Sequence, residues 1–198
     1  MIEFNNLSRE TPYQLFYEKY NEAMSMREKN IQAMAISSYS REREEISSRF
    51  VNLKIIDNNN FIFFTNYKSS KANEFLSHNQ IAALIYWPSI NVQIRIKSKV
   101  KKTSKEYNQK YFYKREEKKN ALAISSRQSK QIDSYSKVKE NYNRVLKVAD
   151  LKKCPVYWGG YSFVPYYFEF WEGHQSRINK RDAYDMIDGI WSHSFLQP

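Results

Sequence analysis

The residues best suited to bind an anion are concentrated in one segment of the sequence. Residues 97–119 contain ten Lys or Arg and three Glu, so this segment carries +7 of the formal charge of +11. Tyr111 and Arg115 are four residues apart, which places a hydroxyl and a guanidinium on one helical face, where both can bind the same phosphate. The same pattern is also typical of a solvated helical face or, with 16% aromatic residues, of a nucleic-acid-binding surface.

A second candidate anion site lies at the start of an expected short helix. Ser69, Ser70 and Lys71 combine two hydroxyls and an ammonium with the unpaired backbone N–H groups of a helix start. The alternative is a serine that only caps the helix. Arg49 and Lys54 are separated by an odd number of residues, so in a regular strand they point to opposite faces. They reach one pocket only through a bulge or an interface.

Composition excludes several classes of site. There are four glycines, none arranged as GxGxxG or GxxxxGK[ST], so the sequence lacks a dinucleotide fingerprint and a P-loop. The one cysteine, Cys154, rules out an internal disulfide and a cysteine-based zinc site. The three histidines lack metal-ligand spacing, and we expect no metal. No apolar run reaches the length of a membrane span and no signal peptide is recognisable, so we expect a cytoplasmic protein.

The elements that must position these residues are mostly strands. Short apolar or alternating runs separated by polar turns are typical of antiparallel strands. We expect strands within 33–36, 50–56, 61–64, 82–87, 92–100 and 162–171, a hairpin from 176–185 and 191–196, and helices over 11–30, 69–79, 104–115 and 131–148. A Lys/Glu-rich hinge is expected between the last two helices, and Pro165 indicates a sheet edge or a bulge. These elements predict one mainly β (α+β) domain, a barrel with peripheral helices.

Taken in order, these motifs resemble those of the pyridoxamine 5′-phosphate oxidase family of FMN-dependent enzymes. The matching strings over residues 12–198 are RFVNLK (49–54), FFTNYKSSK (63–71), YW (86–87), VQIRI (92–96), YFYKR (111–115), SSRQS (125–129), WGGY (158–161), EFWEG (169–173), RINKR (177–181) and the terminal LQP. The resemblance implies a homodimer of FMN-binding split β-barrels with FMN at the subunit interface. It implies a single domain over 1–198, with a flexible N-terminal arm (1–10) and a C-terminal segment for dimerisation and substrate binding (155–198).

The resemblance also assigns roles to individual residues. The implied FMN contacts are Arg49, Val51, Leu53, Lys54, Phe64, Thr65, Ser70, Lys71, Gln93, Gln128, Ser129, Trp171 and Arg181. The implied contacts to the phosphate of a vitamin B6 substrate are Lys54, Tyr111, Arg115 and Lys119, and Arg177 and Asn179 would flank the substrate ring as catalytic residues. The implied reaction oxidises pyridoxamine or pyridoxine 5′-phosphate to pyridoxal 5′-phosphate, with O₂ as acceptor and H₂O₂ as product.

Several positions depart from the family pattern. The family usually has Arg at the positions of Ser70, Val92 and Phe195, Ser at that of Lys119 and His at that of Asn179. Asn179 retains hydrogen bonding but cannot carry charge, and Lys119 can bind phosphate as a point charge. Val92 and the serine-rich stretch 125–129 also resemble the sister flavin oxidases of phenazine biosynthesis. The alternatives are therefore a flavin oxidase for another substrate and a non-catalytic protein that binds FMN or pyridoxal phosphate; we expect neither membrane nor nucleic acid as a partner.

Overall fold

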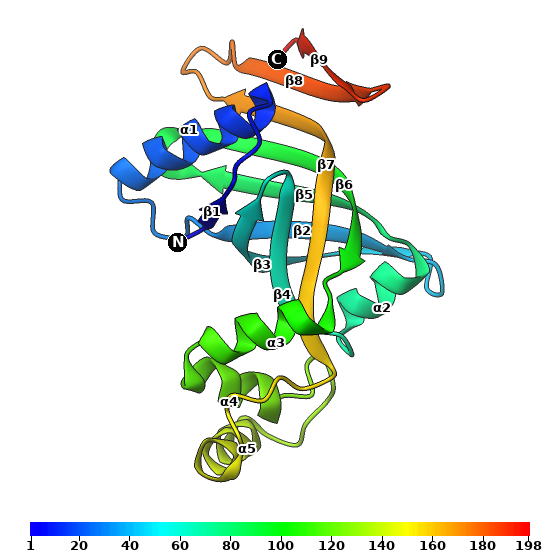
Figure 1. The fold of residues 1–198 in the computed structure, drawn as a ribbon. Helices are drawn as coiled ribbons and strands as arrows, with labels where there is room; N and C mark the ends of the chain where they lie inside the picture. The colour runs from blue at the N-terminus through cyan, green and yellow to red at the C-terminus, as the bar shows by residue number, and fades with distance from the viewer.

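The computed structural model describes residues 1–198 and is built around one nine-stranded sheet (Figure 1). The strands are β1 (Glu3–Asn5), β2 (Ala33–Ser40), β3 (Glu45–Asp57), β4 (Asn60–Asn66), β5 (Gln80–Trp87), β6 (Val92–Lys102), β7 (Trp158–Glu172), β8 (Lys180–Ile187) and β9 (Ile190–Phe195). The helices are α1 (Thr11–Ser25), α2 (Ser70–Ser77), α3 (Lys105–Lys114), α4 (Glu117–Ser125) and α5 (Tyr135–Val148), with a 3-10 turn, η1 (Pro88–Ile90). None of these helices has both the length and the apolar character needed to cross a membrane.

The sheet curls into a ring because β4 pairs with two strands that are far from each other in the sheet order. The hydrogen-bonded order is β1-β3-β2-β5-β6-β7-β8-β9, and β4 pairs with both β3 and β7. Strands β3, β2, β5, β6, β7 and β4 therefore form a closed circuit of pairings, as in a barrel. The β8–β9 hairpin extends from β7 outside this circuit, at the end of the molecule opposite α3, α4 and α5 (Figure 1). The predicted mainly β fold with peripheral helices is confirmed.

Aromatic side chains fill the interior of the ring. Along β5, exposed and buried residues alternate without interruption, because successive side chains of a strand point to opposite faces. The α1 helix covers one end of the ring through Phe16, whose ring centroid lies 5.2 Å from that of Phe61 and 5.7 Å from that of Trp87. These three rings are fully buried, so α1 is held on the ring by apolar packing.

The N-terminal residues differ from the flexible arm expected over 1–10. Glu3–Asn5 form β1, which pairs in parallel with Ile55–Asp57 of β3. Ile2 is buried, and its backbone N–H donates to the hydroxyl of Tyr20 at 3.1 Å. The arm is therefore held on the ring by contacts with residues distant in sequence, which a local pattern does not contain.

The segment expected as a hinge between two helices is itself a helix, α4. Its buried residues are Asn120 and Ala121, so it lacks the apolar stripe that usually identifies a helix. The side-chain amide of Asn120 donates to the carbonyls of Phe112 at 2.9 Å and Leu151 at 2.8 Å. A buried polar residue thus fixes α4 against the end of α3.

Strand β7 is longer than expected and central, although it contains Pro165. Ser98 of β6 lies opposite Pro165, whereas the preceding residue, Lys97, lies opposite Tyr167. One residue of β7 is therefore extra at this point, which is the bulge that the proline indicated.

Candidate functional site

The first turn of α2 holds a buried ammonium group without a carboxylate partner. Lys71 is 6% exposed, and its Nζ donates to the hydroxyls of Thr65 at 3.1 Å and Ser69 at 3.3 Å. Burial, together with the nearby charge of Arg49, lowers the pKa of Lys71 to about 8. A buried cation that is bonded only to neutral hydroxyls is costly to desolvate, so this turn is suited to an anionic ligand.

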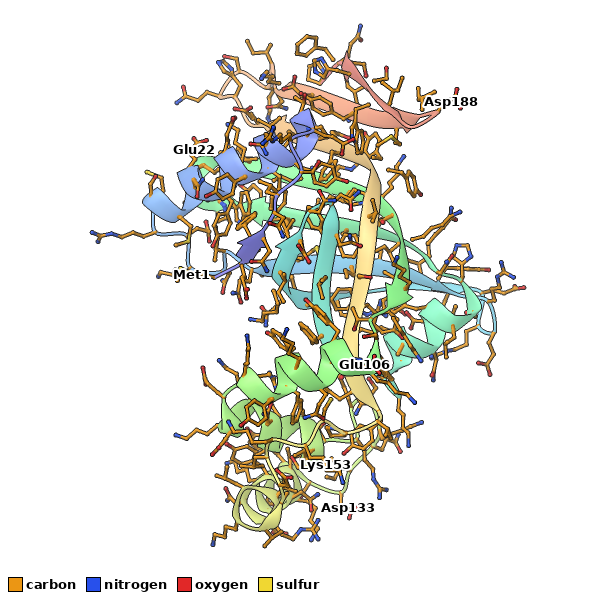
Figure 2. All side chains as sticks on the ribbon, in the orientation of Figure 1. Met1, Glu22, Glu106, Asp133, Lys153 and Asp188 are labelled. Atoms are coloured by element: carbon orange, nitrogen blue, oxygen red, sulfur yellow. The ribbon has the colours of Figure 1, made fainter.

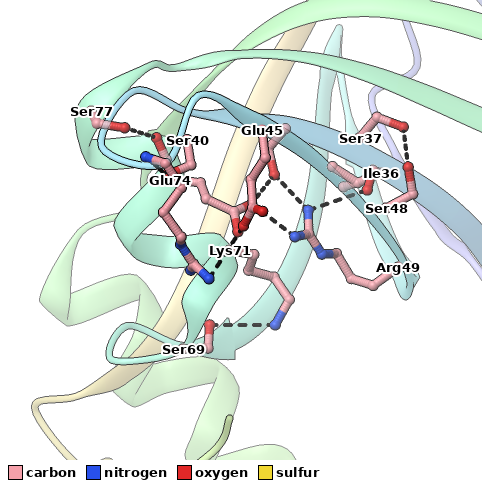
Figure 3. Close-up of polar contacts among 12 residues, drawn as sticks. Ile36, Ser37, Ser40, Glu45, Ser48, Arg49, Ser69, Lys71, Glu74 and Ser77 are labelled. Atoms are coloured by element: carbon pink, nitrogen blue, oxygen red, sulfur yellow. Dashed lines mark hydrogen bonds and ion pairs between the residues drawn. The ribbon is translucent and has the colours of Figure 1, made fainter.

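Arg49 reaches the same turn from β3 and is held there by a buried carboxylate. Its guanidinium lies 2.7 Å from the carboxylate of Glu74 in α2, and it also donates to the hydroxyl of Ser38 (Figure 3). Ser38 in turn donates to Glu74. This arrangement fixes the side chain of Arg49, and it neutralises a carboxylate that would otherwise repel an anion.

A cavity of about 420 Å³ opens onto both cations. Its lining residues are Arg43, Ser47, Arg49, Phe50, Ser70, Lys71, Glu74, Gln128 and Ser129. Three cations, one carboxylate, three hydroxyls and a helix start together form a donor set that suits a phosphate monoester. Five of the FMN contacts implied by the resemblance lie here, and they fit the phosphate end of that group: Arg49, Ser70, Lys71, Gln128 and Ser129.

Two further FMN contacts implied by the resemblance lie on β3. Leu53 is fully buried in the core, and Val51 is half-buried and packs against that core. The side chain of Leu53 is therefore occupied by core packing, and any contact of Leu53 with a cofactor would have to come from its backbone.

A second group of cations consists of Lys54, Arg115 and Lys119. Burial lowers the pKa of Lys54, and the charges of Lys119 and Arg115 lower it further, so the three side chains lie close enough to interact. Burial also lowers the pKa of Arg115, and the nearby Tyr111 hydroxyl raises it in part. The four residues implied for the substrate phosphate are thus brought together within one chain.

Lys54 belongs to this second group because β3 contains a bulge. The β3–β4 register shifts between Leu53 and Ile55, so Lys54 is the extra residue. A bulge, one of the two arrangements that would let Arg49 and Lys54 reach one pocket, is therefore present. Even so, the two cations contribute to different groups, since Arg49 interacts with Lys71 and Lys54 interacts with Arg115 and Lys119.

Parallel aromatic rings form a wall beside this second group. The ring centroids of Phe64 and Tyr111 are 3.7 Å apart with planes inclined by 8°, and those of Phe64 and Trp158 are 5.2 Å apart. The guanidinium carbon of Arg115 lies 5.2 Å from the centre of the Trp158 ring. The wall faces a cavity of about 260 Å³, which is lined by Phe64, Thr65, Asn66, Arg115, Lys119, Leu122, Ala123, Ser126, Gln128 and Trp158. A flat aromatic wall beside cations suits an aromatic ring that carries a phosphate.

Gln128 connects the two cavities, since it lines both. Its Oε1 accepts from the hydroxyl of Thr65 at 3.2 Å and from the backbone N–H of Asn66 at 3.3 Å. Thr65 also accepts from Lys71 at 3.1 Å, so a continuous set of hydrogen bonds runs from α2 to the second cavity.

The two glycines of the WGGY string let α3 approach β7 closely enough to position Tyr111 and Arg115. The backbone N–H of Gly160 donates to Oδ1 of Asn108 in α3 at 2.8 Å. A Cβ at Gly160 would lie 2.7 Å from Oγ1 of Thr103, and a Cβ at Gly159 would lie 2.3 Å from the Asn108 amide nitrogen. These distances are below van der Waals contact, so the glycines are required by packing.

The remaining FMN contacts implied by the resemblance lie at the other end of β7. Gln93 of β6 pairs with Trp171 of β7, and Trp171 pairs with Arg181 of β8. Phe64, by contrast, pairs with Gly160. Trp171 follows Gly160 by 11 residues, which corresponds to roughly 36 Å along an extended strand at about 3.3 Å per residue, far longer than one flavin.

The two residues implied as catalytic, Arg177 and Asn179, lie near this distal end, between β7 and β8. Arg177 is exposed, and Oδ1 of Asn179 accepts from the backbone N–H of His174 at 3.0 Å. In Figure 2, the hairpin that carries Asp188 lies well away from the helix that carries Glu106. One chain therefore does not assemble all of these residues around one ligand.

Sequence reasoning missed Glu169, which holds Arg181 as Glu74 holds Arg49. Glu169 is 1% exposed and accepts from Arg181 at 2.8 Å, from Arg95 at 2.8 Å and from the Tyr167 hydroxyl at 2.9 Å. Burial raises the pKa of Glu169, but the bonds from Arg181 and Tyr167 outweigh it and hold the pKa below its usual range. The sequence signal that could have found it is a carboxylate between two phenylalanines of a predicted strand, because a buried carboxylate needs hydrogen-bond or ion-pair partners.

Two family models match most of the chain. Residues 21–148 match the model described as pyridoxamine 5′-phosphate oxidase. Residues 158–198 match the pyridoxine 5′-phosphate oxidase C-terminal dimerisation region, which supports a homodimer.

Individual relatives agree with these matches. The chain is 31% identical to pyridoxine/pyridoxamine 5′-phosphate oxidase 1 of Hydrogenovibrio crunogenus over 94% of this chain and 88% of that protein. It is 35% identical to pyridoxine/pyridoxamine 5′-phosphate oxidase of Legionella pneumophila (strain Paris), over 87% of this chain and 81% of that protein.

Solved structures show the same fold. PhzG from Burkholderia lata, in complex with tetrahydrophenazine-1-carboxylic acid, superposes with a TM-score of 0.88 at 25% identity, covering 94% of this chain and 92% of that chain. An FMN-binding protein of Nostoc punctiforme, related to pyridoxamine 5′-phosphate oxidase, has a TM-score of 0.77 at 12% identity, covering 96% of this chain and 99% of its own. Together with the family models, these likenesses confirm the resemblance that the motifs indicated: the chain belongs to the pyridoxamine 5′-phosphate oxidase family of oxidoreductases, and FMN is its cofactor.

Proposed function

We propose that this protein oxidises pyridoxamine or pyridoxine 5′-phosphate to pyridoxal 5′-phosphate, with O₂ as acceptor and H₂O₂ as product. The observation that carries the proposal is the group formed by Lys54, Arg115 and Lys119 beside an aromatic wall. The charges of Lys119 and Arg115 lower the pKa of Lys54, and an anion bound between the three side chains would stabilise its charged form; a phosphate monoester is close to a dianion at pH 7. The stacked aromatic rings supply apolar surface that a pyridine ring can contact.

In the free protein these cations have partners that a phosphate can replace. Lys119 pairs with Glu116 at 2.6 Å in an exposed ion pair, and Lys54 donates to the side-chain oxygen of Gln32 at 2.5 Å. Exposed ion pairs contribute little to stability, so exchanging Glu116 for a substrate phosphate costs little. Binding at the phosphate anchors the substrate away from the carbon that reacts, which lets the protein orient that carbon.

We further propose that each site is completed by the second subunit. The Arg49–Lys71 cavity would hold the FMN phosphate, and Gln93, Trp171 and Arg181 of the partner chain would contact the rest of the flavin. Arg177 and Asn179 of that same partner chain would flank the substrate ring. The distance of roughly 36 Å along β7 supports this arrangement, since a homodimer can bring the two ends together as one chain cannot. Bound FMN would supply the redox chemistry, as acceptor of a hydride equivalent from the substrate and donor of electrons to O₂. With the amine substrate, water would then hydrolyse the resulting imine to the aldehyde and release ammonia.

A second candidate is oxidation of a reduced phenazine-type carboxylic acid. It is favoured by the TM-score of 0.88 to PhzG, whose structure contains tetrahydrophenazine-1-carboxylic acid. Asn179 and Val92, where the B6 enzymes usually have charged or titratable side chains, also allow it. The cation group distinguishes the candidates, because a carboxylate carries one charge and a phosphate monoester nearly two.

A peroxide assay on the purified yellow protein tests the proposal. We expect H₂O₂ and pyridoxal 5′-phosphate in equal amounts from pyridoxamine 5′-phosphate, and little reaction with unphosphorylated pyridoxamine. Arg115→Met should raise KM for the phosphorylated substrate roughly 10- to 100-fold, the effect of losing a charge-assisted hydrogen bond, whereas Lys114→Met, at the exposed neighbouring position, should not. Peroxide from a reduced phenazine acid alone would favour the second candidate, and bound flavin without peroxide from any substrate would indicate a non-catalytic binding protein.

A further inference from the structure

The cavity at the start of α2 has fewer available cations than its lining suggests. Of its three cations, Arg49 already shares a buried ion pair with Glu74, which is 3% exposed. Figure 3 shows Arg49 reaching Glu74, while the ammonium of Lys71 lies beside Ser69. Position 70, which lines the same cavity, is an uncharged serine. The fixed part of the site therefore offers one uncompensated positive charge, that of Lys71.

A phosphate monoester needs more positive charge than this. Its charge at pH 7 is about −1.5 to −2, and it binds best to several donors that carry charge. Arg43 is the one other cation that lines the cavity. It lies between β2 and β3, in the turn that faces α2 across the cavity.

The local structure directs Arg43 to this cavity without committing its side chain. The backbone N–H of Arg43 donates to the hydroxyl of Ser40 at 3.2 Å, and Ser40 is 6% exposed, so the turn is anchored to the ring. The guanidinium pairs with Glu45 at 3.2 Å, and both side chains are about half exposed. Such an exposed pair contributes little free energy, so the guanidinium can exchange Glu45 for a phosphate, which it can bind with two parallel hydrogen bonds.

We propose that Arg43 is the second phosphate-binding cation of the FMN site and that it replaces, from the β2–β3 turn, the positive charge absent at Ser70. The inference rests on the placement of the FMN phosphate in the Arg49–Lys71 cavity proposed above. It adds a residue from a different element to that site. It also makes the β2–β3 turn, and not α2 alone, responsible for the preference for the phosphorylated flavin.

The test compares the dissociation constants of FMN and riboflavin, which differ by the phosphate alone. Apoprotein is titrated with each flavin, and quenching of flavin fluorescence is measured for the full-length chain. We expect Arg43→Gln to weaken FMN binding roughly 10- to 100-fold, as expected for a lost hydrogen bond between charged groups, and to leave riboflavin binding within about twofold. Unchanged riboflavin binding also shows that the variant is folded.

Arg41 provides a matched control in the same turn. It is exposed like Arg43, but it lines a different cavity, beside His78 and Lys101. Arg41→Gln should therefore leave both constants unchanged. The double variant Arg43→Gln/Ser70→Arg should regain most of the affinity for FMN, because it moves the missing charge back to the start of α2.

Three results would overturn the inference. If Arg43→Gln binds FMN as the unsubstituted protein does, Arg43 does not contact the phosphate. If it weakens FMN and riboflavin equally, Arg43 acts on the fold and not on the phosphate. If Lys71→Ala also leaves the ratio of the FMN and riboflavin dissociation constants unchanged, the phosphate lies elsewhere, and the proposed placement fails together with the inference. If Lys71→Ala changes this ratio and Arg43→Gln does not, the placement stands and only the role of Arg43 is wrong.

Discussion

Two buried carboxylates organise the arginines that the family resemblance assigns to FMN. Glu74 holds Arg49 beside α2, and Glu169 holds Arg181 at the other end of β7. In each case the acid is almost fully buried and the arginine is partly exposed, so the pair fixes the guanidinium while leaving part of it accessible. Fixing a flexible cation before the ligand arrives reduces the conformational entropy lost on binding. At the scale of single residues, these carboxylates therefore pre-organise two of the arginines implied for FMN binding.

We predict that Lys71 makes FMN binding dependent on pH. Its pKa of about 8 in the free protein means that it is largely protonated at pH 7 and largely neutral at pH 9. A bound phosphate stabilises the ammonium and raises its pKa in the complex, so the dissociation constant of FMN should be nearly constant below pH 7 and should increase by up to about tenfold per pH unit above pH 8. Titrations of apoprotein with FMN between pH 6.5 and 9.5 measure this dependence.

The matching variants isolate the side chain that titrates. Lys71→Ala should bind FMN more weakly at pH 7 and should lose the increase above pH 8. Lys68→Ala removes an exposed lysine three residues earlier, whose Nζ lies 5.6 Å from the centre of the Tyr157 ring, and it should retain the dependence. An unaltered pH profile in Lys71→Ala would assign the titration to another group.

At the scale of elements, the contact between α3 and β7 positions the second cation group. Asn108 accepts from both Gly160 and Thr103, and the absence of side chains at the two WGGY glycines brings the helix close to the strand. Tyr111, one turn later on α3, then stacks on Phe64 of β4. A small displacement of α3 would therefore move Tyr111 and Arg115 together.

Gly160→Ala should both destabilise the protein and impair substrate binding. The added Cβ would lie 2.7 Å from Oγ1 of Thr103 and 3.2 Å from the ring of Phe64. The Thr103 hydroxyl, which donates to Asn108 of α3, must therefore move. We expect a loss of about 1–3 kcal/mol in the free energy of unfolding, measured by urea denaturation, and a raised KM for the phosphorylated substrate. Gly189→Asn is the control: nothing lies within 4 Å of its Cβ position, and asparagine tolerates its positive φ of 83°. Equal losses in the two variants would show that the WGGY packing has no special role.

At the scale of the whole molecule, the site residues divide into two sets at opposite ends of β7. Lys71 and the cation group belong to one end, and Trp171, Arg177 and Arg181 belong to the other. The match of residues 158–198 to a dimerisation region places the second set in the part of the chain that associates with a partner. A homodimer would therefore contain two sites, each built from the first set of one chain and the second set of the other.

This arrangement predicts that two inactive variants restore activity when mixed. Lys71→Ala should bind FMN poorly, and Arg177→Ala should retain FMN but turn over slowly. After the two are unfolded together and refolded, about half of the dimers should be mixed, and each mixed dimer has one intact site, so about a quarter of the normal number of sites should be active. Peroxide production and bound flavin measure the recovery. If the mixture is no more active than the average of the two parent variants, each site is built within one chain.

The sequence by itself determined the family, the cofactor and the mainly β architecture. Residue types at the spacing of RFVNLK, FTNYKSSK, WGGY and EFWEG are local properties, and alternating apolar residues show strands without knowledge of their partners. The serine that replaces an arginine at position 70 was also visible, as was the odd spacing of Arg49 and Lys54, which allows them one pocket only through a bulge or an interface.

The tertiary structure alone decided how these residues are grouped. The partners of Glu74 and Glu169 are 25 and 12 residues away in the sequence, and α4 is held by Asn120 and not by an apolar stripe. β1 is fixed by β3, more than 50 residues later. Hydrogen bonds and ion pairs of this kind depend on which strands become neighbours when β4 joins β3 to β7, and that pairing is a property of the folded chain.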